Sequence, residues 1–178
     1  LEMLGEVRFF SPLKDKKLDD PDLIYIPGGY PELYLDELSR NQSIMSYIKD
    51  YVENGGYLLA ECGGLIYLSK SIKTKEGKYK LCNVFPFEIE MDKRHRSLGY
   101  VEVETVNNPL FGSTKLKGHR FHYSFISNGF EGLNKTYIIK RNNLSEMEGY
   151  TYKNAVASYV HIHFGSNLSS VEMMIKKV

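Results

Sequence analysis

The chain has 178 residues, of which 42% are hydrophobic and 25% charged, and its formal net charge is +1. This length accommodates one compact domain with its own core, and a second domain is not expected. The near-neutral charge argues against nucleic acid or a membrane surface as the partner, because there is no basic excess to displace counterions, and favours a small molecule or another protein.

Strand-like and helix-like patterns alternate in the first part of the chain. Residues 7–13 and 23–29 are expected to contain short strands that end in turn residues, and residues 44–52 carry apolar side chains at the spacing of one helical face. Asn41 is the expected cap of that helix, and Gly55 is its expected end.

The later part of the chain is richer in strand patterns. Residues 57–60 predict a buried strand, residues 65–72 a helix, and residues 81–139 a strand-rich stretch. The last strand is expected over residues 157–164, and the last helix begins at about Ser169. The alternation predicts an α/β domain built on a mostly parallel sheet.

The first residues and the two cysteines indicate where the protein is located and whether the domain begins upstream of this sequence. The chain opens in what resembles the end of a helix, so a first strand is expected upstream of it. No apolar run approaches the roughly 18 residues that span a bilayer, and the first residues lack the layout of a signal peptide. The only cysteines are Cys62 and Cys82, which is no secreted disulfide framework and favours the cytoplasm.

Cys62 lies between a predicted strand and a predicted helix, in the stretch AECGG. Ligands of such folds bind beyond the carboxyl ends of the strands, and a strand-to-helix elbow forces its central residue into a strained conformation that needs small neighbours, here Ala60, Gly63 and Gly64. The start of a helix also favours a thiolate. Cys62 is therefore a candidate nucleophile, whereas Cys82 has no such setting and is expected to be structural.

A cysteine nucleophile needs a base, and the last predicted strand offers two imidazoles. His161 and His163 are two residues apart, so a strand places them on one face, where one can take the thiol proton and the other can orient it. A metal site drawn from these residues and the pair His119 and His122 is the less favoured alternative, because neither pair has a carboxylate or thiol at ligand spacing. No metal is expected.

Five segments together carry a family resemblance: PGGYPELYLDELSRN, AECGGLIYLSKSI, MDKRHRSLGY, GHRFHYS and ASYVHIHF. In this order they resemble the glutamine amidotransferase domain of cobyrinic acid a,c-diamide synthases, from about Phe10 to about Phe164. The resemblance implies a flavodoxin-like class I glutamine amidotransferase fold, with helices flanking the sheet. It also implies that the domain hydrolyses glutamine to glutamate and ammonia. It implies Cys62 as nucleophile and His161 as base, with His163 where many related glutaminases have a glutamate.

The remaining roles follow from the chemistry of amide hydrolysis. Backbone N–H groups in glycine-rich turns suit the oxyanion, and Gly29 and Gly63 are the candidates. A guanidinium binds a carboxylate bidentately, so Arg94 is the candidate ligand of the glutamine α-carboxylate, with Arg96 as the close alternative. The family resemblance favours Arg94 over a solvated surface turn. Glu32 and Glu61 lie beside the site and are most simply hydrogen-bond partners of neighbouring turns.

The family implies parts that this sequence does not contain. Its members carry an amino-terminal ATP-binding synthetase domain, and no G-x-x-x-x-G-K-[ST] phosphate loop occurs here. The chain is therefore expected to be a glutaminase fragment, residues 1–178, without a cofactor of its own. ATP and Mg²⁺ are expected in the missing domain. The chain would reach a corrinoid acceptor only through that domain.

Several points stay open from the sequence. The acceptor is expected to be cobyrinate, at its a and c side chains, with another tetrapyrrole such as nickel sirohydrochlorin as the alternative. Arg120 stands where many relatives are expected to have a glutamate, so the role of GHRFHYS is undecided. A non-catalytic interaction module and a flavodoxin-like stress-response protein with a cysteine elbow are the rival interpretations, and the second lacks the paired histidines.

Overall fold

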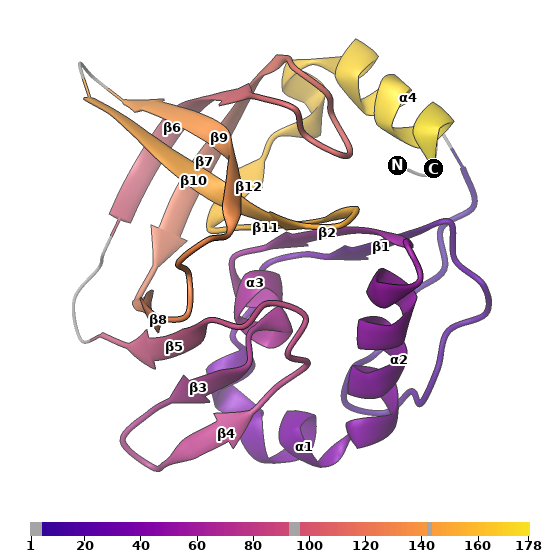
Figure 1. Ribbon diagram of the computed structural model, residues 1–178, viewed down its shortest axis with the longest axis vertical. Helices are drawn as coiled ribbons and strands as arrows, with labels where there is room; N and C mark the ends of the chain where they lie inside the picture. The colour runs from indigo at the N-terminus through magenta and orange to yellow at the C-terminus, as the bar shows by residue number, and fades with distance from the viewer. Residues whose placement is uncertain (1–4, 93–96, 142–143) are drawn as a thin grey trace.

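The computed structural model describes residues 5–92, 97–141 and 144–178 (Figure 1). Its helices are α1 (Leu35–Arg40), α2 (Gln42–Glu53), α3 (Gly63–Leu68) and α4 (Leu168–Lys177), with the short 3₁₀ turns η1 (Pro31–Leu33) and η2 (Phe164–Ser166). The strands in the first part are β1 (Leu23–Ile26), β2 (Tyr57–Glu61), β3 (Ser71–Lys73), β4 (Lys78–Lys80) and β5 (Glu88–Met91). The later strands are β6 (Ser97–Thr105), β7 (Lys115–His122), β8 (Ser124–Asn128), β9 (Asn134–Arg141), β10 (Leu144–Tyr152), β11 (Ala155–Ser158) and β12 (Val160–Ile162).

Eight of these strands form one curled sheet in the order β1-β2-β11-β10-β9-β6-β7-β12. Only the pairs β1 with β2 and β2 with β11 are parallel, and the other pairs of this sheet are antiparallel. The expectation of a mostly parallel sheet is therefore wrong for the sheet as a whole. It holds for β1, β2 and β11, which lie next to the helices, whereas antiparallel pairs add the other five strands.

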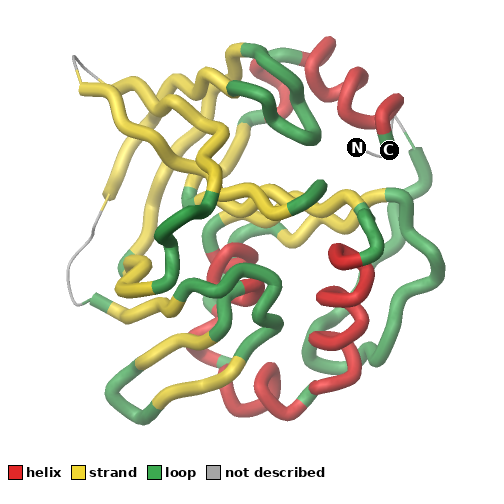
Figure 2. Tube along the Cα trace, in the orientation of Figure 1, coloured by secondary structure: helices red, strands yellow, loops and turns green. Residues whose placement is uncertain are grey.

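The parallel strands lie between helices on both sides, which Figures 1 and 2 show as α2 and α3 on one side and α4 on the other. Leu58 packs in one apolar cluster with α2 and α3, while its neighbour Leu59 packs in a second cluster with Met174 of α4. Both faces of β2 are buried for this reason, so the strand has a continuous apolar run instead of an alternating one.

One feature of the sheet decides how the site is built. β11 and β12 are separated by Tyr159 alone, yet β11 pairs with β2 and β10 while β12 pairs with β7 at the far edge of the sheet. The chain thus crosses at Tyr159 from the third position of the sheet to the eighth. The curled sheet brings its two ends together at this point, beside the carboxyl end of β2.

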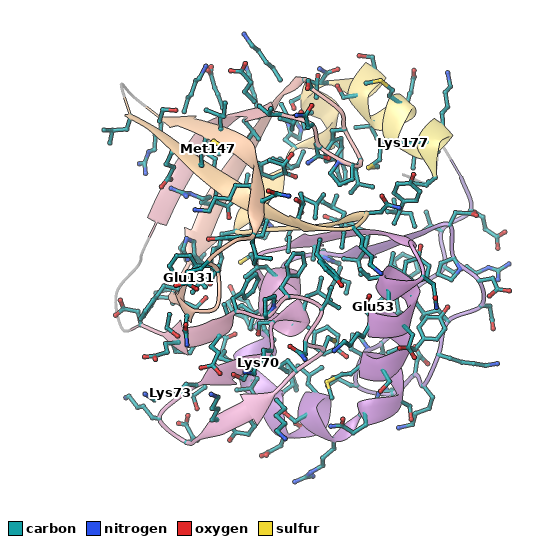
Figure 3. The ribbon with its side chains drawn as sticks, viewed as in Figure 1. Glu53, Lys70, Lys73, Glu131, Met147 and Lys177 are labelled. Atoms are coloured by element: carbon teal, nitrogen blue, oxygen red, sulfur yellow. The ribbon has the colours of Figure 1, made fainter. Side chains whose placement is uncertain are left out.

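A second sheet of four strands, in the order β4-β3-β5-β8, packs beside α3 (Figure 1). Ion pairs connect its two inner strands: Lys70 and Lys73 lie 3.9 Å from carboxylate oxygens of Glu88 and Glu90, respectively, and both lysine side chains, labelled in Figure 3, are exposed.

Several expected elements differ from the structure. Residues 7–13 form no strand, and the helix expected over residues 65–72 ends at Leu68, after which the chain enters β3. Asn41 precedes α2 as expected, but its side chain makes no capping hydrogen bond, because its Oδ1 accepts from Lys16 Nζ at 3.1 Å. Its NH₂ group donates to the carbonyls of Pro12 and Asp15 and so anchors that loop. In the described residues, no helix is long and apolar enough to cross a membrane.

Candidate active site

The elbow expected at Cys62 is present between β2 and α3. Cys62 has φ +49° and ψ −101°, a conformation that L-residues rarely adopt, and its N–H donates to the carbonyl of Ser158 at 2.7 Å. Gly63 and Gly64 are needed next to it: a Cβ at Gly63 would lie 2.6 Å from the carbonyl oxygen of Gly29, and one at Gly64 would overlap the carbonyl of Ile26. The elbow is therefore held against the end of β1 by direct backbone packing.

The same turn after β1 also reaches the histidine. A Cβ at Gly28 would overlap Cε1 of the His161 ring and would lie 3.0 Å from its Nδ1. Gly28 therefore contacts His161, and the next residue, Gly29, contacts the residue after Cys62. Two consecutive glycines thus contact the candidate base and the residue next to the candidate nucleophile, although β12 and β2 share no ladder of backbone hydrogen bonds among the described strands.

The His161 imidazole is half-buried and stacks on His119, with 4.6 Å between the ring centroids and 6° between the ring planes. Burial, and next the nearby His119, lower the pKa of His161. The ring is therefore neutral at pH 7, the state in which an imidazole can accept a proton. His119 faces His161 because β7 and β12 pair in that register, which the sequence did not indicate.

His163 lies just beyond β12 and is exposed. Its N–H donates to the carbonyl of Lys117, and its ring lies against Gly165, where a Cβ would be 3.2 Å from Nε2. In the described part of the chain no hydrogen bond joins its ring to His161. The two histidines share a segment, but the ring that contacts His161 is that of His119.

The thiol of Cys62 is in a buried, protonated state. Burial raises the pKa of Cys62 to about 11, with the carboxyls of Glu32 and Glu61 adding to the effect and the N–H of Gly63 opposing it. The thiol donates to the carbonyl of Phe121, with 3.6 Å between sulfur and oxygen. The expectation that the start of α3 lowers the thiol pKa is wrong for this state, because desolvation outweighs the few N–H dipoles of a six-residue helix.

Glu61, next to the candidate nucleophile, has partners that its sequence position did not indicate. Its side chain is 2% exposed, and its two carboxylate oxygens accept hydrogen bonds from Ile162 N–H at 2.9 Å and from the Tyr25 hydroxyl at 2.8 Å. Burial raises the pKa of Glu61 to about 7. It is a hydrogen-bond partner, as expected, but of the histidine strand 101 residues away and not of a neighbouring turn.

The other sequence candidates lie elsewhere or outside the described residues. Arg94 falls in residues 93–96, outside the described ranges. Arg120 belongs to strand β7, not to a loop, and its guanidinium pairs with Glu146 of β10. Cys82 is buried, and burial raises its pKa well above the usual range, as expected of a structural thiol.

The described residues contain no group of three or more His, Cys, Asp or Glu side chains arranged to hold a metal ion. His122 is engaged separately: it stacks on Tyr159 at 3.9 Å between ring centroids, and its Nδ1 lies 2.8 Å from the carbonyl of Ser124. What the site offers chemically is a thiol, a neutral imidazole and backbone N–H groups, the components of covalent acyl transfer.

Two solved structures share the fold of this chain. A structure described as a glutamine amidotransferase matches with a TM-score of 0.60 at 20% identity, over 88% of this chain and 80% of that one. PurLQS from Thermotoga maritima matches with a TM-score of 0.59 at 15% identity, over 92% of this chain and 79% of that one. At these identities the matches establish the fold, which confirms the expected fold class.

Sequence comparison gives nearer relatives. Proteins named cobyrinate a,c-diamide synthase from Caldanaerobacter subterraneus and Leptospira interrogans are 42% and 40% identical over 99% and 97% of this chain. The chain spans 40% and 39% of the length of these two relatives. The model of the CobB/CobQ-like glutamine amidotransferase domain matches residues 1–168. The chain therefore belongs to the family of CobB/CobQ-like glutamine amidotransferase domains.

Proposed function

We propose that this chain is a glutaminase domain in which Cys62 and His161 hydrolyse the side-chain amide of glutamine. The observation that carries the proposal is the pair of glycines after β1: Gly28 contacts the His161 ring, and Gly29 contacts the backbone next to Cys62. These two contacts support a pairing of the Cys62 elbow with the His161 imidazole. The family membership supports the same reaction.

In the first half of the reaction the sulfur of Cys62 attacks the amide carbon of glutamine. The thiol has a pKa of about 11, so its proton has to be taken up in the attack, and neutral His161 is the acceptor. The carbonyl π electrons move to oxygen, and the N–H groups of Gly29 and Gly63 stabilise the resulting oxyanion. Gly63 suits this role because it is the first residue of α3, where a backbone N–H has no partner within the helix.

In the second half the carbon–nitrogen bond breaks and His161 returns the proton to the departing nitrogen, which leaves as ammonia. Water then attacks the γ-glutamyl thioester, His161 takes a proton from this water, and the sulfur leaves carrying that proton. Glutamate is released and Cys62 is restored. His163 is assigned a secondary, orienting role, and Arg94 is the proposed ligand of the substrate α-carboxylate.

The ammonia can form an amide only if it reaches an activated carboxylate. We propose that an ATP-binding synthetase domain, using ATP and Mg²⁺, activates the a and c carboxylates of cobyrinate and receives ammonia from this domain. The names of the relatives and their greater length support this assignment. Addition of that domain from one of these relatives, with ATP, Mg²⁺ and cobyrinate, should raise glutamine turnover, whereas stimulation by nickel sirohydrochlorin instead would identify the other acceptor.

Covalent labelling tests the glutaminase proposal directly. A chloroketone analogue of glutamine should alkylate Cys62, detected by mass spectrometry of peptides, and excess glutamine should protect it. Cys82 in the same chain is the internal control, because it is 3% exposed and lies outside the elbow between β2 and α3. Cys62→Ala should abolish labelling and ammonia release, and labelling mainly at Cys82 would refute the assignment.

A further inference from the structure

Among the described strands, the one that carries His161 has an edge without a partner strand. β12 pairs with β7 on one side only, and its two N–H groups on the other side, those of Val160 and Ile162, point toward β11 and β2. Side chains satisfy both: the Ser158 hydroxyl accepts from Val160 at 2.9 Å, and the Glu61 carboxylate accepts from Ile162 at 2.9 Å. The position of this edge therefore depends on two side chains and not on a ladder of hydrogen bonds.

Glu61 is held on its other side as well. Its second oxygen accepts from the hydroxyl of Tyr25 on β1, and the Tyr25 ring meets the ring of Phe164 edge-on, with 5.6 Å between centroids. Tyr25 and Glu61 thus contact the histidine segment at Ile162 and at Phe164, just after His161. Because Glu61 directly precedes Cys62, the nucleophile and the base are linked through a single buried side chain.

Burying a carboxyl group at this position costs desolvation free energy. β2 is buried between apolar clusters, and an apolar side chain would avoid the cost of desolvating a carboxylate. The N–H of Ile162, however, lies on the edge of β12 that has no backbone partner. Holding it in place requires a hydrogen-bond acceptor on a side chain that reaches from β2 to β12. The two hydrogen bonds of Glu61 meet that requirement.

We propose that Glu61 is a positioning residue of the active site, which fixes the distance between Cys62 and the His161 imidazole by holding Ile162 N–H, with Tyr25 orienting its carboxylate. This inference rests on the proposed glutaminase function. Glu61 does not touch the reacting atoms, so its loss should slow the chemical step and leave substrate binding nearly unchanged.

The test compares Glu61→Ala with Glu61→Gln in the labelling reaction with the chloroketone. The maximal rate of Cys62 alkylation should fall about 10–100-fold in Glu61→Ala, because a displacement of the base of about 1 Å costs that much, while the concentration for half-maximal rate stays within about 3-fold. Glu61→Gln should restore most of the rate, because its amide oxygen can still accept from Ile162 and its NH₂ group can donate to Tyr25. Tyr25→Phe should give an intermediate loss.

Glu53 provides a matched control. Glu53, labelled in Figure 3, is the last residue of α2 and lies before β2, at the end opposite to Glu61. Its exposed carboxylate also accepts from a tyrosine, Tyr152, at 3.0 Å. Glu53→Gln and Tyr152→Phe should leave the labelling rate unchanged. If Glu61→Ala does not fold, Glu61→Asp decides, because it keeps the charge and withdraws the carboxylate by one methylene.

The outcomes separate the two claims. If the unmodified chain is not labelled at Cys62, the proposed function fails and this inference with it. If it is labelled and Glu61→Ala, or Glu61→Asp in its place, reacts at the same maximal rate, the positioning role alone is refuted. A loss in Glu61→Gln as large as in Glu61→Ala would also refute it, because charge and not placement would then be what matters.

Discussion

Gly28 and His161 are in direct contact, so that a methyl group at position 28 would occupy the space of the His161 ring. Gly28 follows β1 and His161 lies in β12, far apart in the chain, and these two strands do not pair among those that the structure describes. The contact shows that the glycine-rich turn after β1 does more than reverse the chain: it leaves room for the imidazole that we propose as the base.

Gly28→Ala should therefore displace the His161 ring without changing any reacting group. We expect glutamine hydrolysis, measured as ammonia release, to fall about 10–100-fold, while the free energy of unfolding falls by about 1–3 kcal/mol from overpacking. Gly5→Ala is the control, since a Cβ there would meet nothing within 4 Å. Full activity in Gly28→Ala would mean that the ring can move aside at no cost to catalysis.

The two histidines should contribute unequally. His161→Ala should reduce glutamine turnover by about 10²–10⁴-fold, because it removes the proton acceptor, whereas His163→Ala should cost about 10-fold or less, because that ring is exposed and not bonded to His161. Steady-state kinetics of ammonia release on both variants measures the difference. Equal losses would contradict the assignment of the base to His161.

The strain at Cys62 can be measured by comparing two small replacements. At φ +49° the backbone of glycine is less strained than that of alanine. The free energy of unfolding in urea should therefore be about 1 kcal/mol higher for Cys62→Gly than for Cys62→Ala. Cys82 gives the control, because it is not among the residues with positive φ. There the order should reverse, and the same order at both positions would show that strain is not what distinguishes Cys62.

Glu61 should make the stability of the domain depend on pH. Its pKa of about 7 exceeds the ordinary value of 4.5, so the folded chain binds this proton more tightly than the unfolded chain does. The free energy of unfolding should then decrease as the pH rises from about 4.5 to 7, by up to about 3 kcal/mol from this group.

Glu61→Gln should remove that part of the pH dependence, as measured by urea unfolding at several pH values. Glu32 and His161 also titrate with shifted pKa values, but both remain in the variant, and Tyr25 and Cys62 stay uncharged over this range. The difference between the two proteins therefore reports Glu61. A difference that does not change between pH 4.5 and 7 would contradict the buried, proton-binding state described above.

The sequence by itself determined the local parts of this protein. The apolar spacing of residues 44–52 produced the buried face of α2, the continuous run of residues 57–60 became a strand buried on both sides, and the glycines after Cys62 marked the elbow. These features depend on residues close together in the chain, whose side-chain spacing and backbone freedom can be read directly. The motifs also sufficed to identify the family.

Only the tertiary structure decided how these parts meet. The antiparallel extension of the sheet, the crossing at Tyr159 and the stacking of His119 on His161 all depend on register and on pairing between distant strands, which local patterns do not specify. The same holds for Cys62, whose sequence setting suggested a low pKa but whose burial raises it. Glu61 is the clearest case: its sequence neighbours suggest a local turn partner, whereas its actual partner, Ile162, is brought to it by the closing of the curled sheet.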